Sequence, residues 1–424
     1  MKIQMIREYP RVLIVGTTPY NPNEASRALD TYFHNWPKDK LRMIFSNSNI
    51  PQKWNYSSLY QITDYDVLNV LRKKNTEAGR VLNDEDLPDS SVKNTDDPLV
   101  KHKKKTILRY YLRKLLWKRK RWTSDRLLKW VDDFNPQIVY ICFSDDYFIL
   151  DIAYFFAQKY KIPVISQIGD DYYFKKSNLF LKPYLLSYKK LFKSIMSSEG
   201  FGVYISSKLA DKYNKCFRMQ GVPFYLSSSV GFANNDIKYE FNYFGKLNLG
   251  RYKSLCILGD ALKAIDDKYC INIYSSDSDK KVVKALMKHN CVYNGEISYL
   301  DVRNKMNSGS FNIVSSGFNK KDIEASRYSL STKVSDSLMS SGPIVVIGGV
   351  GDGAVDFFVE NGGAIMLTNK KIDTLNFKDQ LLDKTLLKNN ILKAREISTK
   401  LFDQEMNATK FERMCYSLTI DKEK

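Results

Sequence analysis

The feature that most constrains this chain is an alternation between short apolar runs and polar, glycine-containing loops that lead into helix-like segments. Val12–Val15 is the first such run, and the loop after it starts at Gly16. Runs that are apolar throughout are typical of strands buried on both faces of a parallel sheet. The alternation returns at Ile138, Val164 and Gly202. It predicts an α/β protein with a doubly wound parallel sheet.

A second series of this kind follows Gly221–Lys238, a segment with proline, a serine run and paired asparagines that we interpret as a linker. The strands predicted beyond it are Phe241–Phe244, Ile271–Tyr274, Cys291–Tyr293, Phe311–Val314, Ile344–Ile347 and Ala364–Leu367. We therefore expect two Rossmann-like domains that frame a cleft. The first is 1–230, with a basic helical insert at about 95–125 and a C-terminal helix at about 400–424 packing back on it; the second is 231–399.

Charge and cysteine content narrow the possible partners and compartments. The 66 Lys and Arg exceed the 47 Asp and Glu, which gives a net charge of +19 and favours nucleic acid, an anionic membrane or phosphorylated substrates. Six scattered Cys, without a CxxC pair, and three His argue against structural zinc and a disulfide framework. A reducing cytoplasm fits best. No signal peptide and no membrane-spanning run is visible, so we expect a cytoplasmic chain that is at most peripheral to a membrane.

Four motifs stand in order in the second half of the chain. They are Gly245-Lys246-Leu247 with Arg251, Val292–Ser298, Ser331–Leu338 with Ser341–Val346, and the glycine pairs Gly348-Gly349 and Gly362-Gly363. Together they resemble the donor domain of glycosyltransferase family 4, which includes bacterial polysaccharide glycosyltransferases. The resemblance covers about Tyr239–Leu367 and is weaker over the N-terminal half. It implies the GT-B fold, in which two Rossmann-like domains face a central cleft.

The resemblance also implies an activity. The expected reaction moves a sugar from a nucleotide-sugar donor, a UDP-sugar, to a glycan or lipid-linked glycan in bacterial surface polysaccharide synthesis. It retains the anomeric configuration and needs neither a metal nor another cofactor. In that mechanism the leaving phosphate can take the acceptor proton. One departure concerns the paired acids, Glu-x7-Glu, that the family often places near the sugar: Asp336 matches the second acid, whereas Tyr328 stands at the first and Glu324 is out of register.

Stabilising a diphosphate leaving group requires cations and helix N-termini. We expect Lys246 and Arg251 to supply the cations, and thus to be catalytic, while Ser331 and Thr332 cap the next helix near the phosphates. Each has a plainer interpretation as a solvated base, a helix cap or a turn residue. The full set expected to bind the donor is Gly16, Lys246, Arg251, Ser275, Gly295, Ile297, Ser331, Thr332, Lys333 and Asp336.

Acidic pairs follow two predicted strands of the first domain. Asp170 and Asp171 are expected to be catalytic, by positioning an acceptor hydroxyl or acting as a base, with helix capping as the alternative. Asp145 and Asp146 form a weaker candidate pair. In the second domain, Asp277-Ser278-Asp279 resembles the metal-binding Asp-x-Asp of the GT-A fold, but its place before a lysine-rich segment indicates an N-cap cluster.

Two basic segments with interleaved apolar residues, Lys101–Trp122 and Phe174–Met196, suggest contact with the inner face of a cell membrane. A solvated helix face is the alternative for both. Two other functions remain open. A nucleic-acid-binding protein would use the basic surface, although no reading module is present and no nucleic acid is expected. A UDP-sugar epimerase of similar shape would need a His acid–base set, yet the three His lie in no matching motif.

Overall fold

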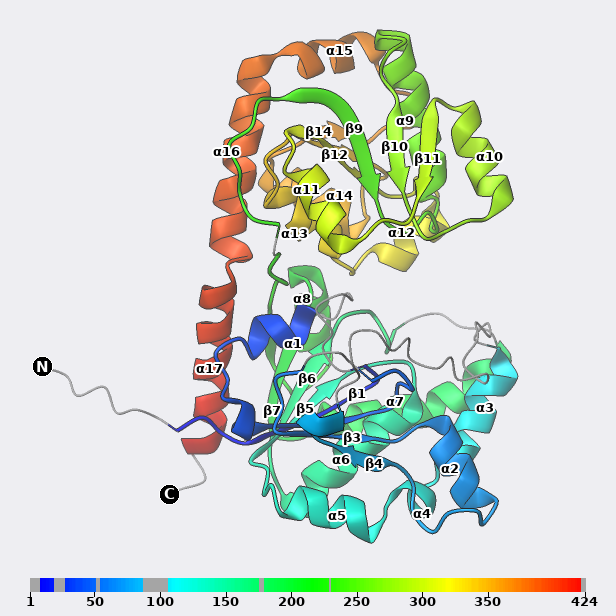
Figure 1. Ribbon diagram of the computed structural model, residues 1–424, viewed down its shortest axis with the longest axis vertical. Helices are drawn as coiled ribbons and strands as arrows, with labels where there is room; N and C mark the ends of the chain where they lie inside the picture. The colour runs from blue at the N-terminus through cyan, green and yellow to red at the C-terminus, as the bar shows by residue number, and fades with distance from the viewer. Residues whose placement is uncertain are drawn as a thin grey trace, which may run out of the picture. The chain divides into compact units, whose positions relative to one another are not determined.

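The computed structural model describes residues 8–18, 27–50, 54–86, 106–174, 179–228 and 230–420. The chain divides into two compact units (Figure 1). Unit 1 comprises Met1–Phe224 and Ala408–Lys424, and unit 2 comprises Tyr225–Asn407. The chain thus enters unit 2 after Phe224, where we expected a boundary at 230, and leaves it after Asn407, where we expected one at about 400.

Unit 1 is built on an eight-stranded sheet in the order β4-β3-β2-β1-β5-β6-β7-β8. Its strands are β1 (Val12–Gly16), β2 (Leu41–Phe45), β3 (Ser58–Gln61), β4 (Arg80–Leu82), β5 (Ile138–Cys142), β6 (Val164–Ile168), β7 (Gly200–Tyr204) and β8 (Gly221–Pro223). All neighbours pair in parallel except β3 and β4, which are antiparallel. The predicted doubly wound parallel sheet is confirmed.

Four strands of this sheet are not visible in the sequence pattern. β2, β3 and β4 precede the basic segment, and β8 lies inside the segment that we interpreted as a linker. β8 is only three residues long, yet Val222 pairs with Val203 of β7 and so extends the sheet. Its proline, Pro223, fits an edge strand, since proline has no N–H to donate to a further neighbour.

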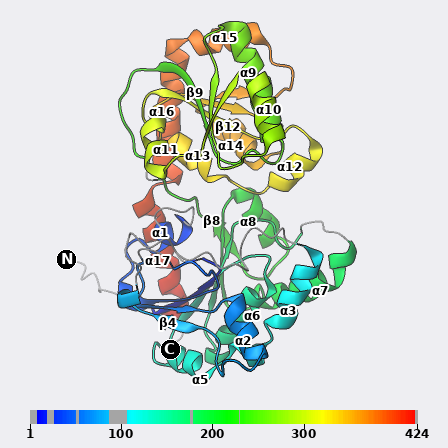
Figure 2. The ribbon, with the colours of Figure 1, turned by 45° about the vertical axis from the view of Figure 1, so that its right-hand side comes forward.

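The helices of unit 1 cover both faces of its sheet (Figures 1 and 2). They are α1 (Arg27–Tyr32), α2 (Asp64–Leu71), α3 (Ile107–Leu116), α4 (Arg119–Trp122), α5 (Asp125–Asp132), α6 (Tyr147–Tyr160), α7 (Lys182–Ile195), α8 (Ser207–Asn214) and, from Ala408 on, α17 (Gln404–Ile420). The part of the expected basic insert that precedes Thr106 lies outside the described residues.

The C-terminal helix α17 is part of the core of unit 1. Phe411 is fully buried, and its ring stacks on Tyr32 with centroids 5.4 Å apart. The ring also meets Phe33 edge-on at 5.1 Å and Phe224 at 6.0 Å. Aromatic side chains bury large apolar areas, so this cluster joins the end of the chain to the first helix.

Unit 2 has a six-stranded, fully parallel sheet in the order β11-β10-β9-β12-β13-β14. Its strands are β9 (Lys238–Phe244), β10 (Ile271–Tyr274), β11 (Cys291–Gly295), β12 (Ser310–Ser315), β13 (Ile344–Ile347) and β14 (Ile365–Leu367). Its helices are α9 (Arg251–Ile265), α10 (Lys280–Lys288), α11 (Tyr299–Met306), α12 (Lys320–Ser326), α13 (Thr332–Leu338), α14 (Gly353–Asn361), α15 (Thr374–Leu382) and α16 (Lys384–Leu401). Within the described residues, no helix is both long and apolar enough to cross a bilayer.

Candidate functional site

The strand order of unit 2 marks one place where a ligand can approach the backbone. Read from β11, the strands run third, second, first, fourth, fifth and sixth in sequence, so the order reverses between β9 and β12. Open α/β sheets bind ligands outside the carboxyl ends of the strands at such a switch point. Here those ends lead into Gly245 and Ser316.

Lys333 reaches this edge from α13. Ser331 caps the helix, since its hydroxyl accepts the N–H of Lys333 at 3.3 Å. The Lys333 amine lies 5.8 Å from the centroid of the Tyr243 ring. A Cβ built on Gly245 would fall 2.1 Å from Cε of Lys333, and the φ of Gly245 is +127°. Only glycine fits this position, because a side chain would displace the lysine and strain the backbone.

The surroundings of Lys333 disfavour its charged form. Burial lowers the pKa of Lys333 to about 8, and the positive charges of Arg251 and Lys246 act in the same direction. The carboxylates of Asp336 and Asp277 oppose the shift. Three cations, Lys246, Arg251 and Lys333, thus stand against two carboxylates at this edge, and a net positive charge favours the binding of an anion.

Lys246 lies in the loop between β9 and α9, and Arg251 is the first residue of α9. Lys246 donates to the Ser276 hydroxyl at 2.6 Å and lies 3.3 Å from Asp277 Oδ1. Asp277 in turn accepts the N–H of Leu247 at 2.7 Å, which ties the loop after β10 to the loop after β9. The Arg251 guanidinium donates to the side chain of Asn248 at 2.8 Å. These contacts hold both cations at the edge where Lys333 ends.

Asp336 is a buried carboxylate on α13. Its Oδ1 accepts the hydroxyl of Ser228 at 2.6 Å. Glu324, the acid nearest in sequence to the Tyr328 position, pairs with Arg327 at 3.1 Å on the exposed side of α12. The role of Asp336 in binding the donor stays a prediction, and its contact with Ser228 is a feature that the sequence motifs did not reveal.

Replacing Ser228 by alanine is expected to lower the free energy of unfolding of unit 2 by about 1–3 kcal/mol, because the buried carboxylate of Asp336 loses a hydrogen-bond donor. Thermal unfolding followed by circular dichroism measures the change. Ser278, an exposed serine in the same unit, provides the control, since Ser278→Ala removes a hydroxyl from the surface. Equal midpoints for the two variants would contradict the expectation.

Three further predicted donor-binding residues lie at the ends of β10 and β11. The N–H of Ser275 donates to the Gly295 carbonyl at 2.8 Å, and its hydroxyl accepts the N–H of Asp277 at 3.0 Å. Gly295 has a φ of +74° in open space, so its backbone conformation alone favours glycine. Ile297 packs against an apolar cluster around Phe244 and Tyr274. These residues line one end of the same sheet edge, and their contact with a nucleotide stays a prediction.

The Asp-x-Asp segment behaves as a helix cap. Oδ1 of Asp279 accepts the N–H groups of Lys281 and Val282, at 2.8 and 3.2 Å, at the start of α10. This confirms the N-cap interpretation. The other acid of the segment, Asp277, has the separate role of holding the loop of Lys246, which we did not anticipate.

In unit 1, the residues predicted for the site lie at the ends of β1 and β6. A Cβ on Gly16 would come within 3.1 Å of Met43 and 3.2 Å of Cys142, so close packing between three strands accounts for this glycine. Asp171 pairs with Lys212 at 2.7 Å and also accepts the Tyr213 hydroxyl at 3.0 Å. Such contacts fix its carboxylate in place. Whether Gly16 touches a donor, and whether Asp170 or Asp171 is catalytic, stays a prediction.

Asp145 and Asp146, the second acidic pair, hold α3 on unit 1. Tyr110 donates its hydroxyl to Asp145 at 2.7 Å, and Arg113 pairs with Asp146 at 2.6 Å. Arg113 also pairs with Asp64 at 3.0 Å. The pair is thus engaged in attaching the basic helix, a structural role that its position after a strand did not indicate.

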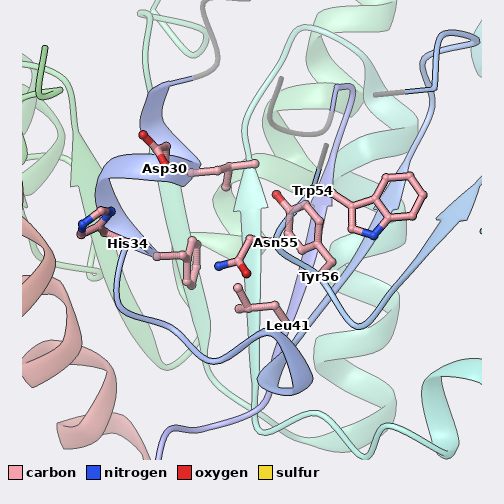
Figure 3. Close-up of a pocket in the computed structure, with 8 residues that line it drawn as sticks. Asp30, His34, Leu41, Trp54, Asn55 and Tyr56 are labelled. Atoms are coloured by element: carbon pink, nitrogen blue, oxygen red, sulfur yellow. The ribbon is translucent and has the colours of Figure 1, made fainter. Parts of the chain in front are cut away.

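Unit 1 also contains a cavity of about 220 Å³ beside α1. Figure 3 shows Asp30 and His34 on one side of it, Trp54 on the other, and Asn55 and Tyr56 between them. Burial raises the pKa of Asp30. The wall includes Leu41, the first residue of β2, so the cavity lies toward the amino end of that strand rather than at the edge where α/β sheets bind ligands.

Sequence comparison finds no relative of this chain. No sequence model of a known protein family matches the chain, and no curated protein matches it in sequence.

Solved structures do match. HepE from Anabaena, solved in complex with UDP, has a TM-score of 0.61 and 11% identity over 96% of this chain and all of that one. Sucrose-phosphate synthase from Thermosynechococcus elongatus has a TM-score of 0.59 and 10% identity over 97% and 99% of the two chains. TarM from S. aureus, in complex with fondaparinux, alpha-GlcNAc-glycerol and UDP, has a TM-score of 0.54 and 10% identity over 96% and 100%. With two α/β sheets that are parallel apart from the pair β3 and β4, and with this likeness over nearly its full length, the chain has the GT-B fold of glycosyltransferases.

Proposed function

We propose that the protein is a glycosyltransferase that takes its sugar from a UDP-sugar donor. The observation that carries this proposal is the group of three cations, Lys246, Arg251 and Lys333, at the switch point of the unit 2 sheet. A diphosphate supplies the negative charge that these side chains can bind. The likeness to HepE, solved with UDP, with UDP and glucose, and with UDP-glucose, supports UDP as the nucleotide and UDP-glucose as the first donor to test.

In this proposal the diphosphate contacts the three cations and the uridine lies toward the ends of β10 and β11. Ser275, Gly295 and Ile297 would line the place of the base, and the buried Asp336 would take a ribose hydroxyl. Ser331 and Thr332 shape the start of α13, so that Lys333 points at the diphosphate.

For the chemistry, we propose a retaining transfer that needs no metal. The bond between the sugar's anomeric carbon and the diphosphate breaks, and negative charge develops on the leaving phosphate oxygen. Lys246, Arg251 and Lys333 would stabilise that charge, the task that a metal performs elsewhere. The acceptor's hydroxyl oxygen bonds to the anomeric carbon with retention of configuration, and the leaving phosphate takes the proton of that hydroxyl. Unit 1 would bind the acceptor, with Asp170 and Asp171 as the candidates to position its hydroxyl.

For the acceptor, we propose a glycan or a lipid-linked glycan at the cytoplasmic face of the cell membrane, in the synthesis of a capsule or another surface polysaccharide. The structural likeness to TarM, solved with fondaparinux, alpha-GlcNAc-glycerol and UDP, supports an acceptor that contains sugar. Accumulation of a lipid-linked precursor in a strain that lacks the enzyme would test the acceptor class directly.

Nucleotide selectivity tests the donor. UDP is expected to stabilise the protein by about 2.7 kcal/mol when its concentration is 100 times the dissociation constant, because it binds the folded state only. Thermal unfolding with UDP, CDP, GDP and single-stranded DNA measures the difference. Stabilisation by DNA and by no nucleotide would contradict the proposal and favour a nucleic-acid-binding protein. A screen of hydrolysis across nucleotide sugars then identifies the sugar.

A further inference from the structure

The basic helix α3 has two faces of opposite character. One face is fixed to unit 1: Arg113 bridges Asp64 and Asp146, and the indole of Trp117 stacks on Phe148 with ring centroids 3.8 Å apart. Tyr110 and Lys114, which also lie on this face, hydrogen-bond to Asp145 and Ser187. These contacts determine which side of the helix points outward.

The outward face of α3 is apolar. Leu108, Leu112 and Leu115 fall at i, i+4 and i+7, opposite the anchored residues. The short helix η3 (Leu179–Leu181) lies beside it, because the Tyr111 hydroxyl donates to the Phe180 carbonyl at 2.9 Å. We call the five side chains Leu108, Leu112, Leu115, Leu179 and Phe180 the α3–η3 face. Each of them is between 55% and 75% exposed, although such residues are usually buried.

Lysines flank the α3–η3 face at the end of α3 and along α7. Neither of the stretches 106–124 and 179–198 contains an Asp or a Glu. Exposed lysines follow α3 at Lys118 and Lys120, and others lie along α7 at Lys182 and Lys190. α3 and α7 run close together in both ribbon views (Figures 1 and 2). A face with leucines and phenylalanine at its centre and lysines beside it is complementary to an anionic bilayer, which offers hydrocarbon beneath a layer of negative headgroups. A nucleic acid would instead require the cations at the centre.

We propose that the α3–η3 face docks on an anionic membrane, with its five apolar side chains inserted at the level of the headgroups and acyl chains. The inference deepens the proposed function, on which it rests, because it assigns to named residues the contact that brings the enzyme to a lipid-linked acceptor. The contacts on the anchored face of α3 hold the docking surface in a fixed orientation on unit 1. The leucines are already exposed, so the helix does not need to refold before it docks.

Co-sedimentation of the full chain with vesicles tests the proposal. The wild type is expected to bind phosphatidylcholine–phosphatidylglycerol vesicles much more tightly than pure phosphatidylcholine vesicles, and more weakly as salt is added. Leu112→Glu and Phe180→Glu are each expected to weaken binding to the anionic vesicles about tenfold, because each places a charge where an apolar side chain inserts. Leu375→Glu makes the same kind of change at a 77% exposed apolar residue of unit 2, and is expected to leave binding unchanged.

A tryptophan probe reports insertion directly. All five native Trp are buried, so Phe180→Trp adds a single exposed indole, which iodide quenches in solution and which anionic vesicles should protect. The proposal would be overturned if the wild type, Leu112→Glu and Phe180→Glu bound vesicles equally. It would also be overturned if iodide still quenched the indole on vesicles, or if dimerisation buried the indole without lipid. UDP affinity measured without vesicles separates this outcome from failure of the proposed function, since neither glutamate variant alters the donor site.

Discussion

Replacing Lys333 by methionine is expected to weaken UDP binding about 10- to 100-fold, because a hydrogen bond to a charged group contributes about 1.5–3 kcal/mol. Methionine keeps most of the length of the side chain, so the contact with Gly245 is retained and only the charge is lost. Isothermal titration calorimetry measures the affinity. Lys268→Met, at an exposed lysine of the same unit, is the matched control and should bind UDP as the wild type does. Unchanged affinity in Lys333→Met would remove this lysine from the proposed site.

The same lysine predicts how UDP affinity depends on pH. The pKa of Lys333 is about 8 without ligand, and a bound diphosphate raises it. Below about pH 7 the amine is protonated in both states, and affinity is at its full value. Above pH 8 binding must take up a proton, so affinity falls as pH rises, by up to about tenfold per unit. The phosphate's own ionisation lies near 6 and does not contribute there. Lys333→Met should abolish the decline, and a decline that persists in the variant would assign it to another group.

Replacing Arg113 by alanine is expected to destabilise unit 1 by about 1–3 kcal/mol, because two partly buried carboxylates lose a charged hydrogen-bond donor, while solvent offsets part of the loss at the more exposed Asp64. Two carboxylates, those of Asp64 and Asp146, would be left without this partner, and the guanidinium also lies 4.7 Å from the Phe148 ring centroid. Burial lowers the pKa of Arg113, but the two carboxylates together outweigh burial and raise it.

Denaturant unfolding followed by tryptophan fluorescence measures that loss selectively, since all five Trp lie in unit 1. Lys118→Ala, at an exposed lysine just beyond the same helix, is the control and should change the unfolding free energy by less than about 0.5 kcal/mol. A similar small change in Arg113→Ala would show that the two carboxylates find other partners or water.

Strands buried on both faces are well predicted from the sequence, because their apolar residues are contiguous. Ile271–Tyr274 and Ile344–Ile347 are the same in the prediction and in the structure. β2 is different, because Arg42 interrupts its apolar run. That guanidinium lies 5.1 Å from the ring centroid of Trp130 and bonds to its carbonyl, a contact 88 residues away in sequence. Because the residue that accommodates the buried charge of Arg42 is so far away in sequence, the residues around Arg42 show no pattern that predicts a strand.

The candidate site is likewise predictable only in part. Lys246, Arg251 and Lys333 could be named from motifs, because each follows a recognisable strand or cap. The contacts that position these three side chains could not be predicted from the sequence. Ser228 lies far from Asp336 in the chain, and the fit of Gly245 against Lys333 depends on how α13 meets the end of β9. The membrane hypothesis likewise began from composition, and only the anchoring of Arg113 and Trp117 shows which face of α3 is turned outward.

The place of α17 in unit 1 has a consequence for how the chain is made. Domains generally fold in the order of their synthesis, the N-terminal one first. Here the aromatic cluster of unit 1 needs Phe411, whereas unit 2 is one continuous stretch, Tyr225–Asn407. As the chain leaves the ribosome, unit 1 emerges first but cannot bury its apolar cluster until Phe411 has been synthesised. Unit 2 can therefore fold before unit 1 is complete. A chain truncated before Ala408 would carry that exposed surface permanently, and its fate would be decided by chaperones and proteases.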